Sequence, residues 1–202
     1  MNYAKGTQQL EGFRKEITQI RKKMRKIQSS LAPEEVEDYA LSGPRGSVHL
    51  SQLFGDKDEL FAVHNMGRSC VYCTLWADGI NGVYDHLVDR AAFVVTSPDA
   101  PAAQQKFARG RGWRFPMLSH KGTSFAKDMG YGSAEDGWRP GISVFKRKGE
   151  KILRVSDTGF GPGDDFSAIW HIFDLLPEGV GEWSPQYKYR AGRKAAMAGC
   201  CS

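Results

Sequence analysis

The residues best suited to chemistry are two cysteines separated by two residues, in the run Cys70-Val71-Tyr72-Cys73. A β-prone run precedes the pair and a helical pattern follows it, which places Cys70 at a helix N-terminus. There, unpaired backbone N–H groups and the helix dipole favour a negative charge, so we expect a pKa below the ~8.5 of a free thiol. Arg68 is expected to add to this effect. The two-residue spacing predicts a nucleophilic Cys70 and a resolving Cys73 within disulfide reach.

Zinc binding is the alternative chemistry for this pair, because zinc prefers tetrahedral sites built from Cys and His. The sequence has no second Cys-x-x-Cys and no His-x-x-x-His, and the remaining cysteines, Cys200 and Cys201, are adjacent and would chelate one ion awkwardly. Soft thiolates also suit copper(I). Cys200 and Cys201 otherwise form either an exchange arm that passes electrons to the main pair or two exposed thiols at a frayed end. The pattern favours redox chemistry, with no metal or cofactor expected.

Segments around the cysteine pair alternate between strand and helix patterns. Residues 59–66 and 91–96 are apolar and β-prone, which is typical of buried strands. Each run is followed by residues with the three- and four-residue apolar spacing of a helix, ending near Arg90 and Gly110. This order predicts parallel strands joined by right-handed crossovers, and therefore an α/β domain with a mixed central sheet flanked by helices.

Two hairpins are expected to complete the sheet, each marked by short β-prone runs on either side of turn-forming residues. The first, near the N-terminus, joins residues 36–40 to residues 47–50 through the turn 42–46, and the second joins residues 140–145 to residues 151–155 through Lys148-Gly149-Glu150.

Helices are also expected near both ends of the chain. Residues 8–31 predict a helix with a basic face and an apolar stripe, which is formed by Leu10, Phe13, Ile17, Ile20, Met24 and Ile27. We expect this stripe to pack on the domain body or to pair with a second copy in a homodimer. A closing helix begins after Asp164 or Asp165 and ends before Pro177. Its expected inner face consists of Phe166, Ile169, Trp170, Phe173 and Leu176.

Length and charge predict one domain with appendages. The 202 residues divide into an N-terminal helical extension (1–34), a central domain (35–183) and a basic, disordered tail (184–202). The formal net charge of +5 comes from the two ends, and we interpret it as solvated side chains rather than a nucleic-acid surface. The sequence shows no apolar leader and no run of ~20 apolar residues, so we expect a cytoplasmic protein without membrane contact.

The order of elements, with Pro140 leading into a hairpin and a helix closing the domain, resembles the thioredoxin-like fold. Residues 35–189 more closely resemble a family of predicted dithiol-disulfide oxidoreductases long catalogued as a domain of unknown function. The segments that carry the resemblance are Ser69-Cys70-Val71-Tyr72-Cys73-Thr74-Leu75-Trp76-Ala77-Asp78-Gly79, Gly112-Trp113-Arg114-Phe115-Pro116, Pro140-Gly141-Ile142-Ser143-Val144-Phe145 and Asp174-Leu175-Leu176-Pro177. It implies disulfide exchange with a protein or small-thiol substrate, supported by an unidentified electron donor.

The resemblance also suggests roles for residues around the pair. Pro140 stands at the position of the thioredoxin cis-proline, which would present the backbone of Arg139 to an incoming chain. His64, six positions before Cys70, stands where thioredoxins often carry a buried acid. It would either take the proton from Cys73 or serve as a hydrogen-bonded core histidine. Tyr72 would contact a partner or shield the sulfurs, and Trp76 would pack in the core or contact substrate.

Two other functions remain open at this level. The run Ser47-Val48-His49-Leu50-Ser51-Gln52-Leu53-Phe54 is similar to the early hairpin of peroxiredoxins, which implies a thiol peroxidase. However, alignment on Cys70 puts Val63 and Gly67 where peroxiredoxins carry Pro and Thr. The other possibility is an interaction protein that binds through its N-terminal helix, with or without a thiolate metal site.

Overall fold

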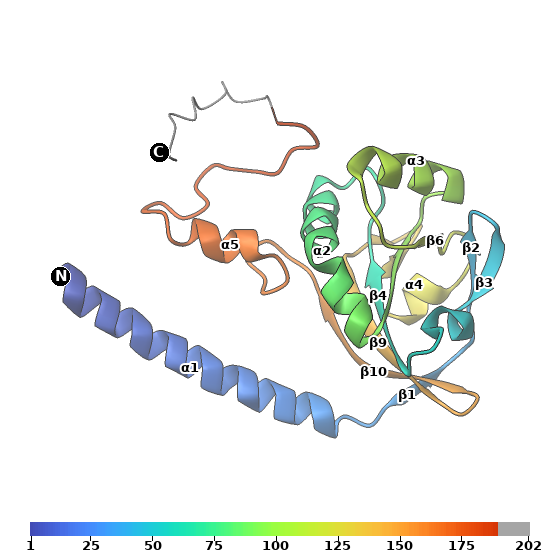
Figure 1. The fold of residues 1–202 in the computed structure, drawn as a ribbon, viewed down its shortest axis with the longest axis horizontal. Helices are drawn as coiled ribbons and strands as arrows, with labels where there is room; N and C mark the ends of the chain where they lie inside the picture. The colour runs from blue at the N-terminus through green and yellow to red at the C-terminus, as the bar shows by residue number, and fades with distance from the viewer. Residues whose placement is uncertain (190–202) are drawn as a thin grey trace, which may run out of the picture.

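The computed structural model describes residues 1–189 of the chain (Figure 1). Its helices are α1 (Tyr3–Ser30), the 3-10 helix η1 (Leu50–Phe54), α2 (Val71–Arg90), α3 (Pro101–Arg111), α4 (Phe125–Asp128) and α5 (Ala168–Phe173). Its strands are β1 (Glu34–Val36), β2 (Ala40–Gly43), β3 (Gly46–His49), β4 (Glu59–His64), β5 (Ala92–Ser97), β6 (Met117–Ser119), β7 (Gly132–Ser133), β8 (Gly137–Trp138), β9 (Gly141–Lys148) and β10 (Lys151–Gly159).

The central sheet is mixed, as the sequence predicts. Its eight strands lie in the order β1-β10-β9-β4-β5-β6-β2-β3, and β7 and β8 form a separate small ribbon. Strands β4, β5 and β6 are parallel, whereas β9 runs antiparallel to β4 and forms a hairpin with β10. The N-terminal hairpin joins β2 to β3 and turns between Gly43 and Gly46, so it lies slightly later than expected at its first strand.

Strand β4 sits in the middle of the sheet and divides the core in two. Leu60 and Ala62 point into a cluster with Phe125 and Phe145, on the face that η1 and α4 cover. Successive side chains of a strand point to opposite faces. Phe61 and Val63 accordingly belong to the other cluster, which includes Ala77 of α2. Helix α2 therefore lies on the Val63 face, and the strand delivers the chain from the middle of the sheet directly to the cysteine pair.

The closing helix is shorter than the sequence predicts. It spans Ala168–Phe173, with Ser167 at the N-cap position. The carboxylate of Asp164 accepts hydrogen bonds from three backbone N–H groups, those of Gly161, Phe166 and Ser167. Asp164 thus closes a loop ahead of the helix. Phe166 lies outside the helix and is exposed, and so is Leu176, so the predicted inner face reduces to a buried Trp170 with its half-buried neighbours.

Helix α1 begins five residues earlier than predicted, because the side chain of Asn2 caps it by accepting the N–H of Lys5 at 2.9 Å. None of its residues is buried. In Figure 1 it extends away from the sheet, and its Arg21 pairs with Asp165 at 2.7 Å. The expectation that the stripe packs on the chain's own domain body is therefore wrong. Among the described residues, no helix combines the length and apolarity that a membrane span needs.

Candidate active site

The cysteine pair follows a tight turn that the end of β4 builds. The side chain of Asn65 accepts the N–H of Gly67 at 2.8 Å, and the N–H of Cys70 donates to the carbonyl of Gly67 at 3.0 Å. Gly67 has φ +98°, and a Cβ there would lie 2.9 Å from a carboxylate oxygen of Asp99. Both its conformation and its surroundings require glycine.

Asp99, at the end of the neighbouring strand β5, holds this turn from the other side. Its carboxylate accepts the backbone N–H of Arg68 at 2.7 Å and lies 3.7 Å from the Arg68 guanidinium. Arg68 is therefore paired with Asp99, and it is not among the groups that shift the pKa of Cys70. The predicted contribution of Arg68 to the Cys70 thiolate is wrong.

Cys70 is the N-cap residue of α2. Its sulfur accepts the backbone N–H of Cys73 at 3.1 Å, which uses one of the unpaired donors of the first helical turn. A hydrogen bond from the Cys73 thiol is the largest influence that lowers the pKa of Cys70, which falls to about 7. Burial opposes this shift, and the backbone N–H groups of Cys73 and Tyr72 support it. Cys70 can therefore supply a thiolate near neutral pH.

Cys73 has the opposite character. Its side chain is buried, and the hydrogen bond to Cys70 raises its pKa, with burial and the Cys70 charge adding to the shift. The backbone N–H of Met66 donates to the Cys73 sulfur at 3.4 Å and lowers the pKa in part. Both cysteines are free thiols here. The pair therefore divides into one ionisable, partly exposed sulfur and one protonated, buried sulfur.

An aromatic layer covers the outer side of the first turn of α2. The ring of Tyr72 stacks with that of Trp170 of α5 at 6.3 Å between centroids. Trp76 is buried, lies 5.6 Å from the ring of Phe160, and donates its Nε1–H to Asp164 at 3.3 Å. Trp76 is thus a packing residue in this structure, while the half-buried Tyr72 remains at the rim of the site.

His64 lines the same crevice as Cys73 and Pro140, but its ring points to the other side of the sheet. Its ring stacks on Tyr131 at 3.9 Å between centroids and lies 2.9 Å from the hydroxyl of Ser143, on the face of the sheet opposite to α2. Burial, followed by nearby His120 and Arg154, lowers the pKa of His64 to about 3. The interpretation as a core histidine fits this position, whereas the proposed proton transfer from Cys73 does not, because strand alternation points the ring away from α2.

Pro140 lies beside Cys73, as its place in the sequence suggested. Both residues line a crevice of about 10 Å³, which is room for about one water molecule. The peptide bond before Pro140 is trans, since the described residues contain no cis peptide bond. The cis-proline expectation is therefore wrong, consistent with the intrinsic preference of X–Pro bonds for trans. Arg139 is exposed, but its backbone N–H already donates to the carbonyl of Tyr131 at 2.9 Å.

Sequence reasoning missed three residues around the site. Asp99 could have been found, because it follows a parallel strand at the same sheet edge as Cys70. The sequence marks Asp164 only as a candidate helix cap. Tyr187 gave no signal, because its segment is polar and was expected to be disordered. Arg111 instead donates to the Tyr187 carbonyl at 2.6 Å, and burial followed by the charges on Cys70 and Cys73 raises the Tyr187 pKa.

A metal site is not formed by the part of the chain that the structure describes. No group of three His, Cys, Asp or Glu side chains among residues 1–189 is arranged to hold an ion. Cys200 and Cys201 lie outside the described residues, so neither their metal nor their exchange role is addressed. The geometry around Cys70 and Cys73 is that of two sulfurs without further ligands.

Residues 2–195 match a family described as a bacterial protein of unknown function (DUF899). The chain belongs to the DUF899 family. Because the match spans nearly the whole sequence, the extension before β1 and the helix α5 are parts of the DUF899 unit. A search of curated proteins found no match to this DUF899 chain.

Solved structures similar to this DUF899 chain include three peroxiredoxin-type proteins. Prx3 of Vibrio vulnificus, solved reduced and in complex with H₂O₂, has a TM-score of 0.52 at 14% identity, covering 66% of this chain and 88% of Prx3. Peroxidoxin BcpB of Mycobacterium tuberculosis gives 0.51 at 20% identity, over 67% and 88%. Peroxiredoxin Q of Xanthomonas campestris gives 0.51 at 19%, over 65% and 87%. At these identities the likeness establishes the thioredoxin-like fold, as the sequence predicted.

Proposed function

We propose that this DUF899 chain is a redox enzyme that exchanges disulfides through Cys70 and Cys73. One observation carries the proposal: the Cys70 sulfur caps α2 and has a pKa lowered to about 7, while its neighbour Cys73 is buried with a raised pKa. Exchange needs one accessible thiolate to attack and a second thiol held in reserve. Cys70 meets the first requirement and Cys73 meets the second.

The reaction proceeds in two balanced steps. The Cys70 thiolate attacks one sulfur of a substrate disulfide, the substrate S–S bond breaks, and one substrate thiolate leaves. Cys73, after losing its proton, attacks the Cys70 sulfur of the mixed disulfide and releases the second substrate thiolate. The substrate gains two electrons and the chain keeps a Cys70–Cys73 disulfide, which an external thiol reductant returns to the dithiol. Run in reverse, the same steps oxidise a dithiol.

The position of Cys70 favours a substrate that presents its sulfur at a surface. Cys70 is partly exposed at the start of α2, and three hollows of about 800, 430 and 260 Å³ elsewhere on the described surface are lined by other residues. An enclosed small-molecule pocket normally surrounds its ligand with several hundred Å³ of concave surface. A disulfide carried by a partner protein, or a small thiol approaching from solvent, fits the exposed sulfur better.

Thiol peroxidase activity is the second candidate, and the peroxiredoxin-type fold favours it. In that reaction the Cys70 thiolate would attack a peroxide oxygen, release water or alcohol, and leave a sulfenic acid for Cys73 to condense with. The residues Val63 and Gly67 offer no hydroxyl to orient a peroxide, so this candidate ranks below disulfide exchange. Hydrogen peroxide consumption by the reduced chain, compared with reduction of a model disulfide, separates the two.

The test is a redox titration of the purified full chain in glutathione buffers, read as free thiols at each mapped cysteine. Disulfide exchange predicts one two-electron transition shared by Cys70 and Cys73 and abolished by Cys70→Ser. The matched control replaces Cys200 and Cys201 with serine and should leave that transition in place. If the transition is missing and the protein carries stoichiometric zinc, the pair is a metal site and the proposal is wrong.

A further inference from the structure

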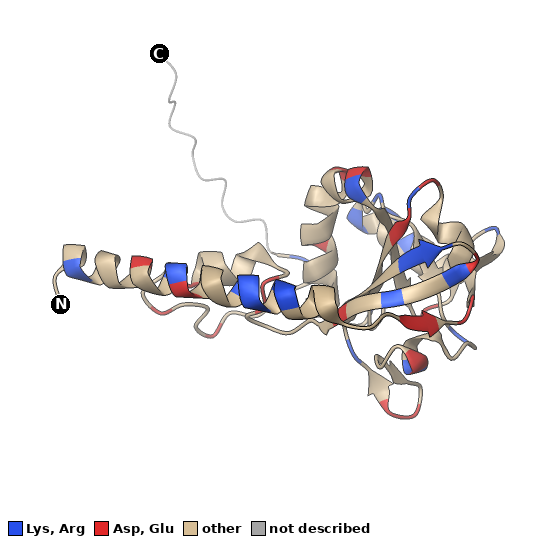
Figure 2. Cartoon of the chain, turned by 90° about the horizontal axis from the view of Figure 1, so that it is seen from below, with Lys and Arg blue, Asp and Glu red and all other residues tan. Residues whose placement is uncertain are grey.

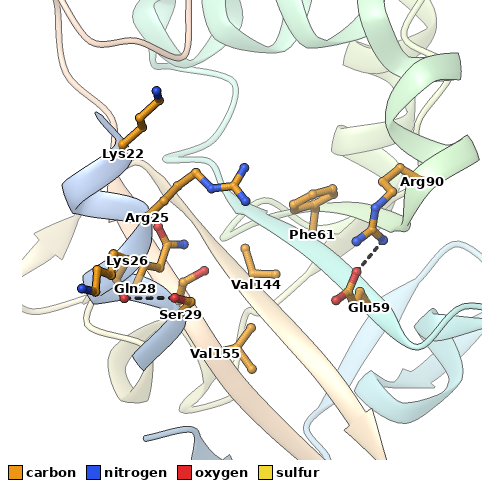
Figure 3. A pocket seen from close by; sticks show the side chains of 11 residues that line it. Lys22, Arg25, Lys26, Gln28, Ser29, Glu59, Phe61, Arg90, Val144 and Val155 are labelled. Atoms are coloured by element: carbon orange, nitrogen blue, oxygen red, sulfur yellow. Dashed lines mark hydrogen bonds and ion pairs between the residues drawn. The ribbon is translucent and has the colours of Figure 1, made fainter. Parts of the chain in front are cut away.

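Helix α1 turns its polar face toward its own domain. Lys22, Arg25 and Lys26 lie on that face and line a hollow of about 800 Å³. Its floor is the sheet surface around Phe61 and Val144, and Figure 3 shows Arg25 reaching from the helix toward Phe61. Residues three and four apart share one side of a helix, so the apolar stripe lies on the other side. The helix therefore presents its polar face to its own domain and its apolar stripe to solvent, which is the reverse of a helix that packs on a core.

The apolar stripe is consequently left in solvent along its full length. Its members are between 45% and 64% exposed, and they are Leu10, Phe13, Ile17, Ile20, Met24 and Ile27. A continuous apolar surface of this kind marks an interaction site in a soluble protein. The described residues of the same chain do not cover it.

The spacing of the stripe identifies the kind of partner. The intervals between its members are three, four, three, four and three residues, which is the seven-residue repeat of a coiled coil. A helix packed on a globular surface follows a period of 3.6 and has a broader apolar face. An isolated helix containing Gly6 and Gly12 is also marginal in water without a packing partner. The partner that this pattern fits is a second helix with the same repeat.

We propose that two copies of this chain dimerise by pairing their α1 helices in a parallel coiled coil. The charges of α1 decide both the partner and the direction. Both acidic residues lie in the first half of the helix, Glu11 and Glu16, while the second half has five cations and no acid: Arg21, Lys22, Lys23, Arg25 and Lys26. Figure 2 shows Lys and Arg gathered in the half of α1 nearer the domain.

Direction follows from where these charges stand in the repeat. The stripe supplies the a and d positions, so Glu16, one residue before Ile17, is a g residue, and Arg21, one residue after Ile20, is an e residue. In a parallel pair, the g residue of one helix faces the e residue of the next heptad in the other, so Glu16 of each copy lies beside Arg21 of the second copy. An antiparallel pair would instead bring e residues together and place Arg14 near Arg21 of the second copy. Lys22, Arg25 and Lys26 lie on the polar face toward the chain's own domain, away from the seam.

The first test is the oligomeric state of the full-length reduced chain by sedimentation equilibrium. The wild type should be a dimer, and Ile17→Glu with Ile20→Glu should make it a monomer. The matched control, Gln8→Glu with Gln19→Glu, adds the same charge to the polar face and should stay dimeric. Gly12→Ala, where a Cβ meets no atom within 4 Å, should tighten the dimer by roughly tenfold through helix propensity. A monomeric wild type, or a dimer that survives the Ile17 and Ile20 changes, would overturn the proposal.

The second test fixes the direction, in a chain whose four native cysteines are replaced by serine. Leu10→Cys alone should give a disulfide between its two copies, because a parallel pair places both copies of residue 10 in the same layer. Mixing Leu10→Cys with Ile27→Cys should give no disulfide between the two variants. A crosslink between the two variants, and none of Leu10→Cys with itself, would show an antiparallel pair and overturn the parallel arrangement.

Discussion

Replacing Cys73 with alanine should raise the pKa of Cys70. The hydrogen bond from the Cys73 thiol is the largest of the influences that lower this pKa from 9.0 to about 7. Alanine removes that donor but keeps the backbone N–H groups of residues 72 and 73 and leaves α2 intact. We expect the pKa of Cys70 to move back toward 9.0. Cys73→Ser keeps a hydroxyl donor at the same place and is the matched control, with a smaller shift.

The size of the effect depends on two opposing quantities. At pH 7, a thiol of pKa 7 is about half ionised and a thiol of pKa 9 about one part in a hundred, so the thiolate population falls by up to about fifty-fold. Thiolate nucleophilicity rises with pKa along a Brønsted slope of about 0.4–0.5, which recovers up to about tenfold. The net rate of alkylation at pH 7 should therefore fall roughly fivefold, while the rate at alkaline pH should rise.

The assay is iodoacetamide labelling of the Cys70 peptide, quantified by mass spectrometry from acidic to alkaline pH. Peptide mapping keeps the labelling of Cys200 and Cys201 separate. The wild-type profile should have its midpoint near 7, and the Cys73→Ala profile a higher midpoint with a higher plateau. A wild-type midpoint near 9, or an unchanged midpoint in Cys73→Ala, would refute the reasoning that the Cys73 thiol prepares Cys70.

Three more predictions follow from the surroundings of the pair. Asp164→Ala removes the acceptor of the Trp76 indole and of three loop N–H groups, so it should destabilise the chain by about 1–3 kcal/mol and red-shift tryptophan fluorescence. Gly67→Ala, which forces a Cβ against Asp99 at positive φ, should lower the free energy of unfolding in urea by about 1–3 kcal/mol. The lowered pKa of His64 means that, between pH 6.5 and 3, the unfolded chain binds a proton that the folded chain does not. His64 should then lower stability by up to about 1.4 kcal/mol per unit as the pH falls, and His64→Phe should remove that part of the slope while His120, whose pKa is also lowered, to about 4, keeps its own part.

The strand and helix order around the cysteine pair could be predicted because local pattern and tertiary position agree there. Residues 59–66 and 91–96 are nearly continuous apolar runs, and such runs occur where both faces of a strand are buried. The structure places β4 and β5 within them as parallel neighbours at the middle of the sheet. The position of Cys70 and Cys73 could be predicted for the same reason, because the sequence pattern indicates both the end of the strand before them and the start of the helix after them.

The predictions that the structure contradicts have a different cause. The side to which a side chain points depends on the position of its strand or helix in the whole fold. The position of His64, six residues before Cys70, suggests a base for Cys73. Its side chain points to the opposite face because Val63, one residue earlier, already faces α2. The closing helix was overestimated because the apolar spacing from residue 166 to 176 continues beyond the loop that Asp164 closes. Neither fact is encoded by local periodicity.

The position of His64 leaves open how Cys73 loses its proton, and the causes of its raised pKa suggest an answer. In the dithiol, the hydrogen bond to Cys70 is the largest cause, burial the second and the charge on Cys70 a further one. When Cys70 enters a mixed disulfide, its sulfur loses its charge and becomes a weak acceptor, so two of these three causes disappear. Burial is then the cause that still raises the pKa of Cys73. The backbone N–H of Met66, which lies 3.4 Å from the Cys73 sulfur, lowers this pKa. The first chemical step thus lowers the pKa of Cys73 when its thiolate is needed, and the departing substrate thiolate can accept the proton.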